Sequence, residues 1–205
     1  MLRIIPRPTN CWLKLLSEHK LPFELLTLKN GDSIFLTDPS LILINIKGIL
    51  SVTRNYITNQ SSIVYLSTSN TVLHYKTNDT ICYHKVQALT ISHIIVFTHN
   101  DILSNSILAG YLRNIELYTL HLELLDLQYW MAIFTQNTVK KRLVVFLLML
   151  SQLFGSPVDQ GVAINLTLPH AYIAEVLCTT RITITRHINE LKKNCFSLDR
   201  KRLFL

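Results

Sequence analysis

The sequence predicts an α+β protein in which a jelly roll or barrel of short strands precedes a long helix and a winged helix-turn-helix. Three observations lead to this fold class. Short apolar runs fill residues 23–97, residues 111–154 contain neither Gly nor Pro, and the last third of the chain is strongly basic. We therefore expect three segments, residues 1–101, 102–135 and 136–205.

The first segment has the pattern of an all-β domain. Turn residues such as Asn30-Gly31, Lys47-Gly48 and Asn59-Gln60 punctuate it. Many short strands without a helical pattern between them are typical of a jelly roll or barrel. The clearest strand candidates are Ser33–Leu36, Leu41–Ile46, Ser62–Leu66 and Ile91–Phe97.

Residues 102–135 have the pattern of one long helix with two apolar stripes. The first stripe repeats at spacings of three and four, at Leu117, Leu120, Leu124, Leu127, Met131 and Phe134. The second lies on another face, at Leu108, Leu112, Ile115, Leu122, Tyr129 and Ile133. Two stripes imply two partners. One can cover the β-domain, and the other, which we take to be the first stripe, can pair with the same helix of a second subunit. The alternative is a helix buried on both faces within one monomer.

A break is predicted at residues 136–138, where Asn137 or Thr138 can cap a new helix. Lys140, Lys141 and Arg142 would lie on its first turn, where cations oppose the helix dipole. They either face something anionic or are solvated surface charges. Gly155 and Pro157 should end this helix.

The positive charge of the chain is concentrated after this break. Residues 136–205 hold ten Lys or Arg against four Asp or Glu, whereas residues 1–135 hold ten against nine. A basic surface on a compact helical unit is typical of a protein that binds a polyanion.

Two helices joined by a tight turn are predicted in HAYIAEVLCTTRITITRHINELKK, residues 170–193. Cys178-Thr179-Thr180 would form the turn. The inward positions would be Ile173, Ala174 and Leu177 of the first helix, with Ile182, Ile184, Ile188 and Leu191 on the second.

The polar residues of the second helix are then left facing outward, where a major groove can admit them. Arg suits guanine and phosphate, and Thr can donate to phosphate or touch a thymine methyl. The tail, residues 195–205, is predicted to form a short hairpin with its cations beside the groove. The candidate DNA-binding residues are Thr180, Arg181, Thr183, Thr185, Arg186, Lys192, Arg200 and Lys201. An αα-hairpin with a purely structural role is the alternative.

Three strings carry a family resemblance: KRLVVFLLMLSQLFG, INLTLPHAYIAEVLCTTRITITRHINELKK and DRKRLFL. They resemble the C-terminal domain of the Crp/Fnr family, and most closely its global nitrogen regulators of cyanobacteria and red-algal plastids. The resemblance is dense from Lys140 to Phe204 and weak before that. It implies a cyclic-nucleotide-binding-type β-roll, a long dimerisation helix and a winged helix-turn-helix.

The resemblance also assigns residues within the second helix. Arg181 and Arg186 fall on the family's DNA-contacting positions. Ile182 stands where the cyclic-AMP-receptor branch has a Glu that reads cytosine, so the preferred site should differ from that receptor's. Cys178 replaces the usual turn Gly, which implies a slightly strained turn.

The function implied is that of a sequence-specific transcription regulator, an activator of nitrogen-controlled genes. It would act as a homodimer on a palindromic site in double-stranded DNA, together with RNA polymerase. Its place would be the plastid stroma if the gene is plastid-encoded, and otherwise a bacterial cytoplasm. Two alternatives stay open: a Crp/Fnr-type regulator with a different effector or none, and a β-roll interaction module that has lost DNA binding.

The sequence does not retain an intact pocket for either of two effectors of the family, cyclic AMP or 2-oxoglutarate. Residues 71–90 lack the Gly, Glu and Arg of a cyclic-nucleotide cassette, which disfavours cyclic AMP. The arginines with which nitrogen regulators bind 2-oxoglutarate fall near Ile81 and on Glu123 in this chain. We therefore expect weak or no 2-oxoglutarate binding, unless Lys76, Lys85 or Arg113 compensates.

An enzyme is not predicted. The eight histidines contain no H-x-H pair, the four cysteines have no C-x-x-C spacing, and no G-x-S-x-G or P-loop is present. A membrane protein is not predicted either, because the longest apolar run is Leu143–Leu150 and a spanning helix needs about 20 apolar residues.

Overall fold

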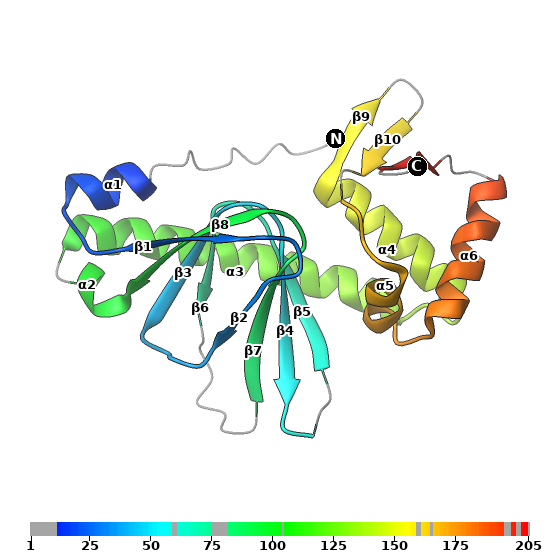
Figure 1. The fold of residues 1–205 in the computed structure, drawn as a ribbon, viewed down its shortest axis with the longest axis horizontal. Coiled ribbons are helices and arrows are strands. Elements are labelled where there is room, and N and C mark those ends of the chain that lie inside the picture. The colour runs from blue at the N-terminus through cyan, green and yellow to red at the C-terminus, as the bar shows by residue number, and fades with distance from the viewer. Residues whose placement is uncertain are drawn as a thin grey trace. The chain divides into compact units, whose positions relative to one another are not determined.

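The computed structural model describes residues 12–58, 61–74, 82–103, 105–158, 161–164, 166–194, 198–199 and 202–204 (Figure 1). The chain divides into two compact units, Met1–Leu124 and Leu125–Leu205. The long helix α3, Ser106–Phe134, belongs to both units.

The first unit is built from strands, with short helices at either end. Its other elements are α1 Trp12–Glu18, β1 Glu24–Leu28, β2 Ser33–Leu36, β3 Leu41–Lys47, β4 Leu50–Tyr56, β5 Ser61–Ser67, β6 Thr71–His74, β7 Cys82–Ala88, β8 Ser92–Thr98 and α2 His99–Leu103.

These strands form two antiparallel sheets, in the orders β1-β8-β3-β6 and β2-β7-β4-β5. The predicted jelly roll is therefore confirmed, and the four predicted strand candidates correspond to β2, β3, β5 and β8. The turn between β3 and β4 needs glycine, because Gly48 has φ +105° and a Cβ there would collide with Ser92.

The first unit buries two apolar clusters, one on each face of the sheet that contains β3. Alternate β3 residues serve the two clusters, since neighbouring side chains on a strand point to opposite faces. Leu43 packs between the sheets with Leu50, Val52 and Val86. The opposite cluster is covered by helices and contains Trp12, Leu16, Ile42, Ile44, Ile46, Val72, Ile95, Phe97, Ile102, Leu108 and Leu112.

A polar contact ties α3 to the last strand of this sheet. The Val72 N–H of β6 donates to Thr119 Oγ1 at 3.0 Å, and both residues are buried. A buried backbone N–H without a partner would be costly, so this bond helps to fix α3 on the sheet.

The second unit combines the end of α3 with three helices and a small sheet. Trp130 of α3 stacks on Phe146 with ring centroids 6.1 Å apart. The small sheet has the order β11-β12-β10-β9. Its elements are α4 Val139–Phe154, β9 Gly155–Val158, β10 Gly161–Ile164, α5 His170–Val176, α6 Arg181–Asn194, β11 Leu198–Asp199 and β12 Arg202–Phe204.

Several element boundaries differ from the sequence predictions. The helix expected from residue 102 is two helices, since Asn105 Oδ1 accepts from the backbone N–H groups of Ile107 and Leu108 and starts α3 afresh. Strand β9 contains Pro157, which the sequence predicted only as a helix stop. The predicted break near Gln136 is confirmed, and Thr138 caps α4 by accepting from Lys141 N at 3.3 Å.

No helix in the described part of the chain is both long and apolar enough to cross a membrane.

Candidate nucleic-acid interface

Helices α5 and α6 pack through the predicted apolar positions, with one exception. Ile173 and Ala174 of α5 and the C-cap residue Leu177 are buried, as are Ile184 and Ile188 of α6. This contact holds α6 by one face and leaves its other face outward. The predicted helix-turn-helix is therefore present as a structure.

Ile182 is the exception, because it is 82% exposed and not an inward residue. It was grouped with Ile184 because the two apolar residues alternate with threonines, which is a period of two. In a helix each residue turns by about 100°, so a residue two positions away lies on nearly the opposite face. Ile182 therefore belongs to the outward face of α6.

The turn before α6 adopts the strained conformation that the sequence indicated. Cys178 has φ +52°, in the left-handed region where a Cβ is unfavourable. Its exposed side chain does not contribute to the core. Thr179 N donates to Ala174 O at 2.9 Å and closes the end of α5.

The outward face of α6 carries three of the six predicted DNA-binding residues that the structure describes, Arg181, Arg186 and Lys192. Its exposed members are Arg181, Ile182, Arg186, Asn189 and Lys192. Asn189 was not predicted, although the helical spacing from Ile182 and Arg186 would have placed it on the same face. We call these five residues the α6 outward face.

The predicted threonines have local structural roles beside this face. Thr180 caps α6, because its Oγ1 accepts from Thr183 N at 3.2 Å. Thr183 is half-buried, and its hydroxyl lies 2.9 Å from that of Thr180. Thr185 is also half-buried and donates to the Arg181 carbonyl at 2.9 Å. Thr185 stands four positions from both Arg181 and Asn189, so it lies between outward residues but is partly covered, whereas Thr183 lies beside the outward face.

The predicted wing is described only in part. Strands β11 and β12 pair antiparallel, with Asp199 opposite Arg202. Arg200 and Lys201, the candidate DNA contacts at the hairpin tip, lie outside the described residues.

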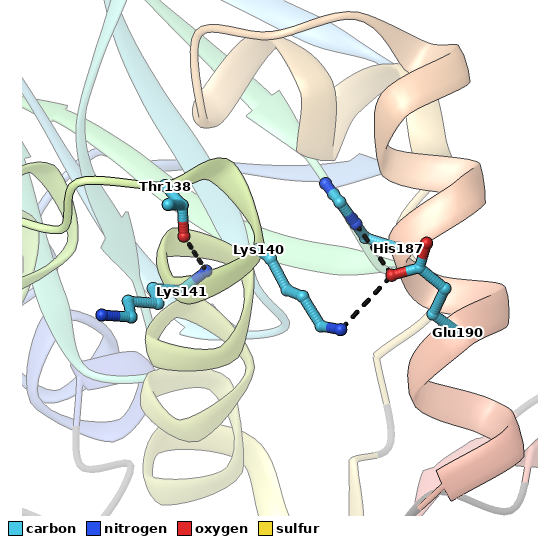
Figure 2. A network of polar contacts seen from close by, with 5 residues as sticks. All are labelled: Thr138, Lys140, Lys141, His187 and Glu190. Carbon is cyan, nitrogen blue, oxygen red and sulfur yellow. Dashed lines mark hydrogen bonds and ion pairs between the residues drawn. The ribbon is translucent and has the colours of Figure 1, made fainter.

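One flank of α6 is tied to α4 by charged contacts (Figure 2). Lys140 Nζ of α4 lies 3.3 Å from Glu190 Oε2, and His187 Nδ1 lies 3.2 Å from the same oxygen. Hydrogen bonds from His187 and then Lys140 lower the pKa of Glu190. The anion that Lys140 faces is therefore a residue of the protein itself, while Lys141 is exposed.

The other flank of α6 has a different charge balance. His170 of α5 lies with its Nδ1 2.9 Å from Thr185 Oγ1. Burial lowers the pKa of His170, and the positive charges of Lys192 and Arg181 lower it further. The groups around this histidine therefore disfavour its charged form.

The two predicted stripes of α3 differ in exposure. The second stripe turns inward, with Leu108, Leu112 and Ile133 buried. All six residues of the first stripe are exposed, from 40% at Leu120 to 68% at Met131. The stripe that we expect at the dimer interface is therefore exposed to solvent in the single chain.

The cations suggested for an effector pocket are not gathered inside the β-sandwich. Lys85 of β7 pairs across strands with Phe35, which is exposed, so Lys85 lies on the outer face of its sheet. Arg113 of α3 is exposed. Lys76 and Ile81 lie outside the described residues.

A cation that the sequence predictions missed is Arg54 of β4. It continues the inward row of Leu50 and Val52, and its Nε donates to Cys82 Sγ at 3.0 Å. Its guanidinium lies 5.5 Å from the Tyr56 ring centroid. The alternation of polar and apolar residues in LSVTRNY would have indicated this inward position.

The described residues contain no group of three or more His, Cys, Asp or Glu side chains placed to hold a metal ion.

The fold and this site define a class of protein: a β-sandwich joined by a long helix to a winged helix-turn-helix with a cationic outward face. Residues 141–202 match the family model of the Crp-like helix-turn-helix domain. The match runs from α4 to β12, so it covers the helix-turn-helix described above.

Individual proteins agree with this class. The chain is 24% identical to the putative HTH-type transcriptional regulator ycf28 of Porphyra purpurea over 209 residues, which cover 98% of this chain and 87% of that protein. It is 43% identical to the global nitrogen regulator of Synechocystis over 63 residues, which cover 30% of this chain and 28% of that protein.

A solved structure with the same fold is a CooA mutant from Carboxydothermus hydrogenoformans. Its TM-score is 0.71 at 17% identity, and the match covers 100% of this chain and 94% of that one.

Proposed function

We propose that this protein is a homodimeric transcription activator of nitrogen-controlled genes that binds a palindromic promoter site in double-stranded DNA. The observation that carries the proposal is the α6 outward face. Arg181, Arg186 and Lys192 stand exposed on a helix whose opposite face is anchored by Ile184 and Ile188. A rigid helix with exposed arginines suits the major groove.

The residues of the α6 outward face divide into base-reading and phosphate-contacting groups. Arg181 and Arg186 suit bidentate contacts to guanine. Ile182 suits the methyl group of a thymine. Lys192 suits a backbone phosphate, which fixes position without reading sequence.

The first stripe of α3 supports the dimer. A continuous exposed apolar row on a helix of this length suits coiled-coil packing against a second copy. A two-fold dimer presents two α6 helices and so requires a palindromic site, with half-sites about 34 Å apart.

The nitrogen assignment draws on the similarity to the Synechocystis global nitrogen regulator. Activation would proceed through contact with RNA polymerase. The similarity to the Porphyra protein supports a plastid stroma as the site of action if the gene is plastid-encoded. A bacterial cytoplasm is the location otherwise.

The effector response should differ from that of the nitrogen regulators. Binding the dianion 2-oxoglutarate requires paired cations, and the outward positions of Lys85 and Arg113 support weak binding or none. Calorimetric titration with millimolar 2-oxoglutarate tests this. A saturable signal together with a gain in DNA affinity would contradict it.

The decisive experiment is selection of bound duplexes from a random DNA pool, with and without 2-oxoglutarate. Enrichment of one palindrome, with affinity that falls steeply with salt, is the expected result. The double variant Arg181→Ala/Arg186→Ala is the control and should enrich no sequence. If the unaltered protein also enriches none, it does not bind DNA sequence-specifically, and the interaction-module alternative replaces the proposal.

A further inference from the structure

His170 lies at a position where a proton could be exchanged as DNA binds. It is the first residue of α5 and contacts α6 beside the α6 outward face. Burial, and the nearby cations Lys192 and Arg181, lower the pKa of His170. In the absence of DNA the imidazole is therefore mostly neutral at about pH 7.

The hydrogen bonds around Thr185 determine which nitrogen of His170 accepts a proton. The Thr185 hydroxyl has one hydrogen, and it is donated to the Arg181 carbonyl at 2.9 Å. Thr185 Oγ1 must then accept from Nδ1–H of His170, 2.9 Å away. The neutral ring therefore carries its free lone pair on Nε2, and an added proton goes there.

The charges around His170 suit an anionic ligand. Lys192 and Arg181 both come from α6, and both act on the imidazole with the same sign. Glu175 of α5 is exposed and stands five positions from His170, about 140° around the helix, so it does not face the ring. An anion placed among these groups would relieve the repulsion between the two cations and a protonated His170.

On the opposite flank of α6, a carboxylate balances the positive charge. There Glu190 lies within 3.3 Å of both Lys140 and His187, so one carboxylate serves two basic groups (Figure 2). On the His170 flank the charges that act on the imidazole are the cations Lys192 and Arg181 of the α6 outward face. A DNA phosphate is the anion that such an edge would meet.

We propose that His170 contacts a backbone phosphate of DNA and takes up a proton when it does so. The proton comes from solvent and adds to Nε2, and the new N–H donates to a phosphate oxygen. This inference rests on the proposed DNA binding. Because the phosphate raises the pKa of His170 from a lowered value, DNA affinity should increase as the pH falls through the pKa of the bound form.

The test is calorimetric titration of the full chain with the selected duplex, from about pH 8 to about pH 6, in two buffers of different ionisation enthalpy. The protein should take up close to one proton per subunit, and its affinity should rise by up to about tenfold per pH unit for each histidine. His170→Gln should match the unaltered protein at the alkaline end and lose the gain at the acid end. His170→Arg, permanently charged, should bind at both ends without proton uptake.

The control is His99→Gln, which alters an exposed histidine of α2 and should leave the proton uptake unchanged. Equal proton uptake by the unaltered protein and both His170 variants would overturn the inference, while sequence-specific binding would stand. Failure of the unaltered protein to bind the selected duplex would instead overturn the proposed function.

A further arm distinguishes DNA phosphate from a free anion. The His170 ring is followed by NMR while inorganic phosphate is added to the protein without DNA. The expected result is little change in the pKa of His170. If inorganic phosphate raises this pKa as much as the duplex does, the site binds a free anion and the assignment to DNA is wrong.

Discussion

Two helices of this molecule present an exposed face, and the two faces differ in chemistry. On α3 the exposed residues are apolar, namely Leu117, Leu120, Leu124, Leu127, Met131 and Phe134. On α6 they are mainly polar and cationic, namely Arg181, Ile182, Arg186, Asn189 and Lys192.

In both helices the opposite face is well packed. Leu108 and Ile133 of α3 are fully buried, and so is Ile184 of α6. Exposure of the remaining face is therefore a property of the sequence pattern and not a sign of a loosely packed helix. The difference in chemistry then indicates different partners: an apolar row suits another apolar row, and a cationic face suits a polyanion.

The largest expected effect comes from placing a charge in the apolar face of α3. Leu124 is 59% exposed in the single chain, so Leu124→Glu should leave the folded subunit intact. In a symmetric dimer the same change buries two carboxylates, at a cost of several kcal/mol. Sedimentation at micromolar concentration should show a dimer for the unaltered protein and a monomer for the variant.

The matched control is Asn114→Glu, an exposed polar α3 position that is not a member of the first stripe. It should remain dimeric. If the unaltered protein sediments as a monomer, or if Leu124→Glu stays dimeric, then this face of α3 does not form the interface.

The next effect concerns the cationic face of α6. Arg181→Ala should weaken binding to the selected duplex by about 1–3 kcal/mol and relax the preference at one base pair. Binding to the selected duplex and to its single-base variants measures both quantities. Equal weakening on every sequence would show that Arg181 contacts phosphate and that its assignment to a base is wrong.

The sequence predicted these two faces with unequal success. On α3 the apolar positions repeat over many turns, so a single period explains all of them. On α6 the run RITIT has the alternation of a strand inside a helix, and this placed Ile182 on the wrong side. Periodicity is informative only once the type of element is known.

The strands show a similar division. β2, β3, β5 and β8 are rich in apolar residues and were predicted from composition. β4 and β7 carry Arg54 and His84 on their inward rows, which interrupts the apolar pattern. The part of the candidate site that lies in the single helix α6 was predicted from the sequence. His170 was missed because only the packing of α5 on α6 brings it to that site.

The effect expected at Ile182 is smaller than that at Arg181, and a second isoleucine of the same helix serves as its comparison. Ile182 is 82% exposed, so Ile182→Ala should change the unfolding free energy by less than about 0.5 kcal/mol. It should nevertheless reduce the preference for thymine at one position, because the methyl contact is lost. Ile184→Ala, at a fully buried position, should cost about 2–5 kcal/mol of stability. Urea unfolding and binding to base variants measure the two effects, and a large stability loss at Ile182 would contradict its outward placement.

The smallest effect concerns the turn that orients α6. Cys178 has φ +52°, which costs a residue with a Cβ about 1–2 kcal/mol relative to ordinary helical geometry. Cys178→Gly removes that cost but gives the unfolded chain more freedom, which offsets about 0.4–1 kcal/mol. The variant should therefore be more stable by about 0.5–1 kcal/mol, as measured by urea unfolding of the second unit. Cys178→Ala is the matched control, because it removes the thiol and keeps the Cβ, and it should leave stability unchanged. An equal gain in both variants would mean that the thiol, and not the backbone conformation, is the source of the strain.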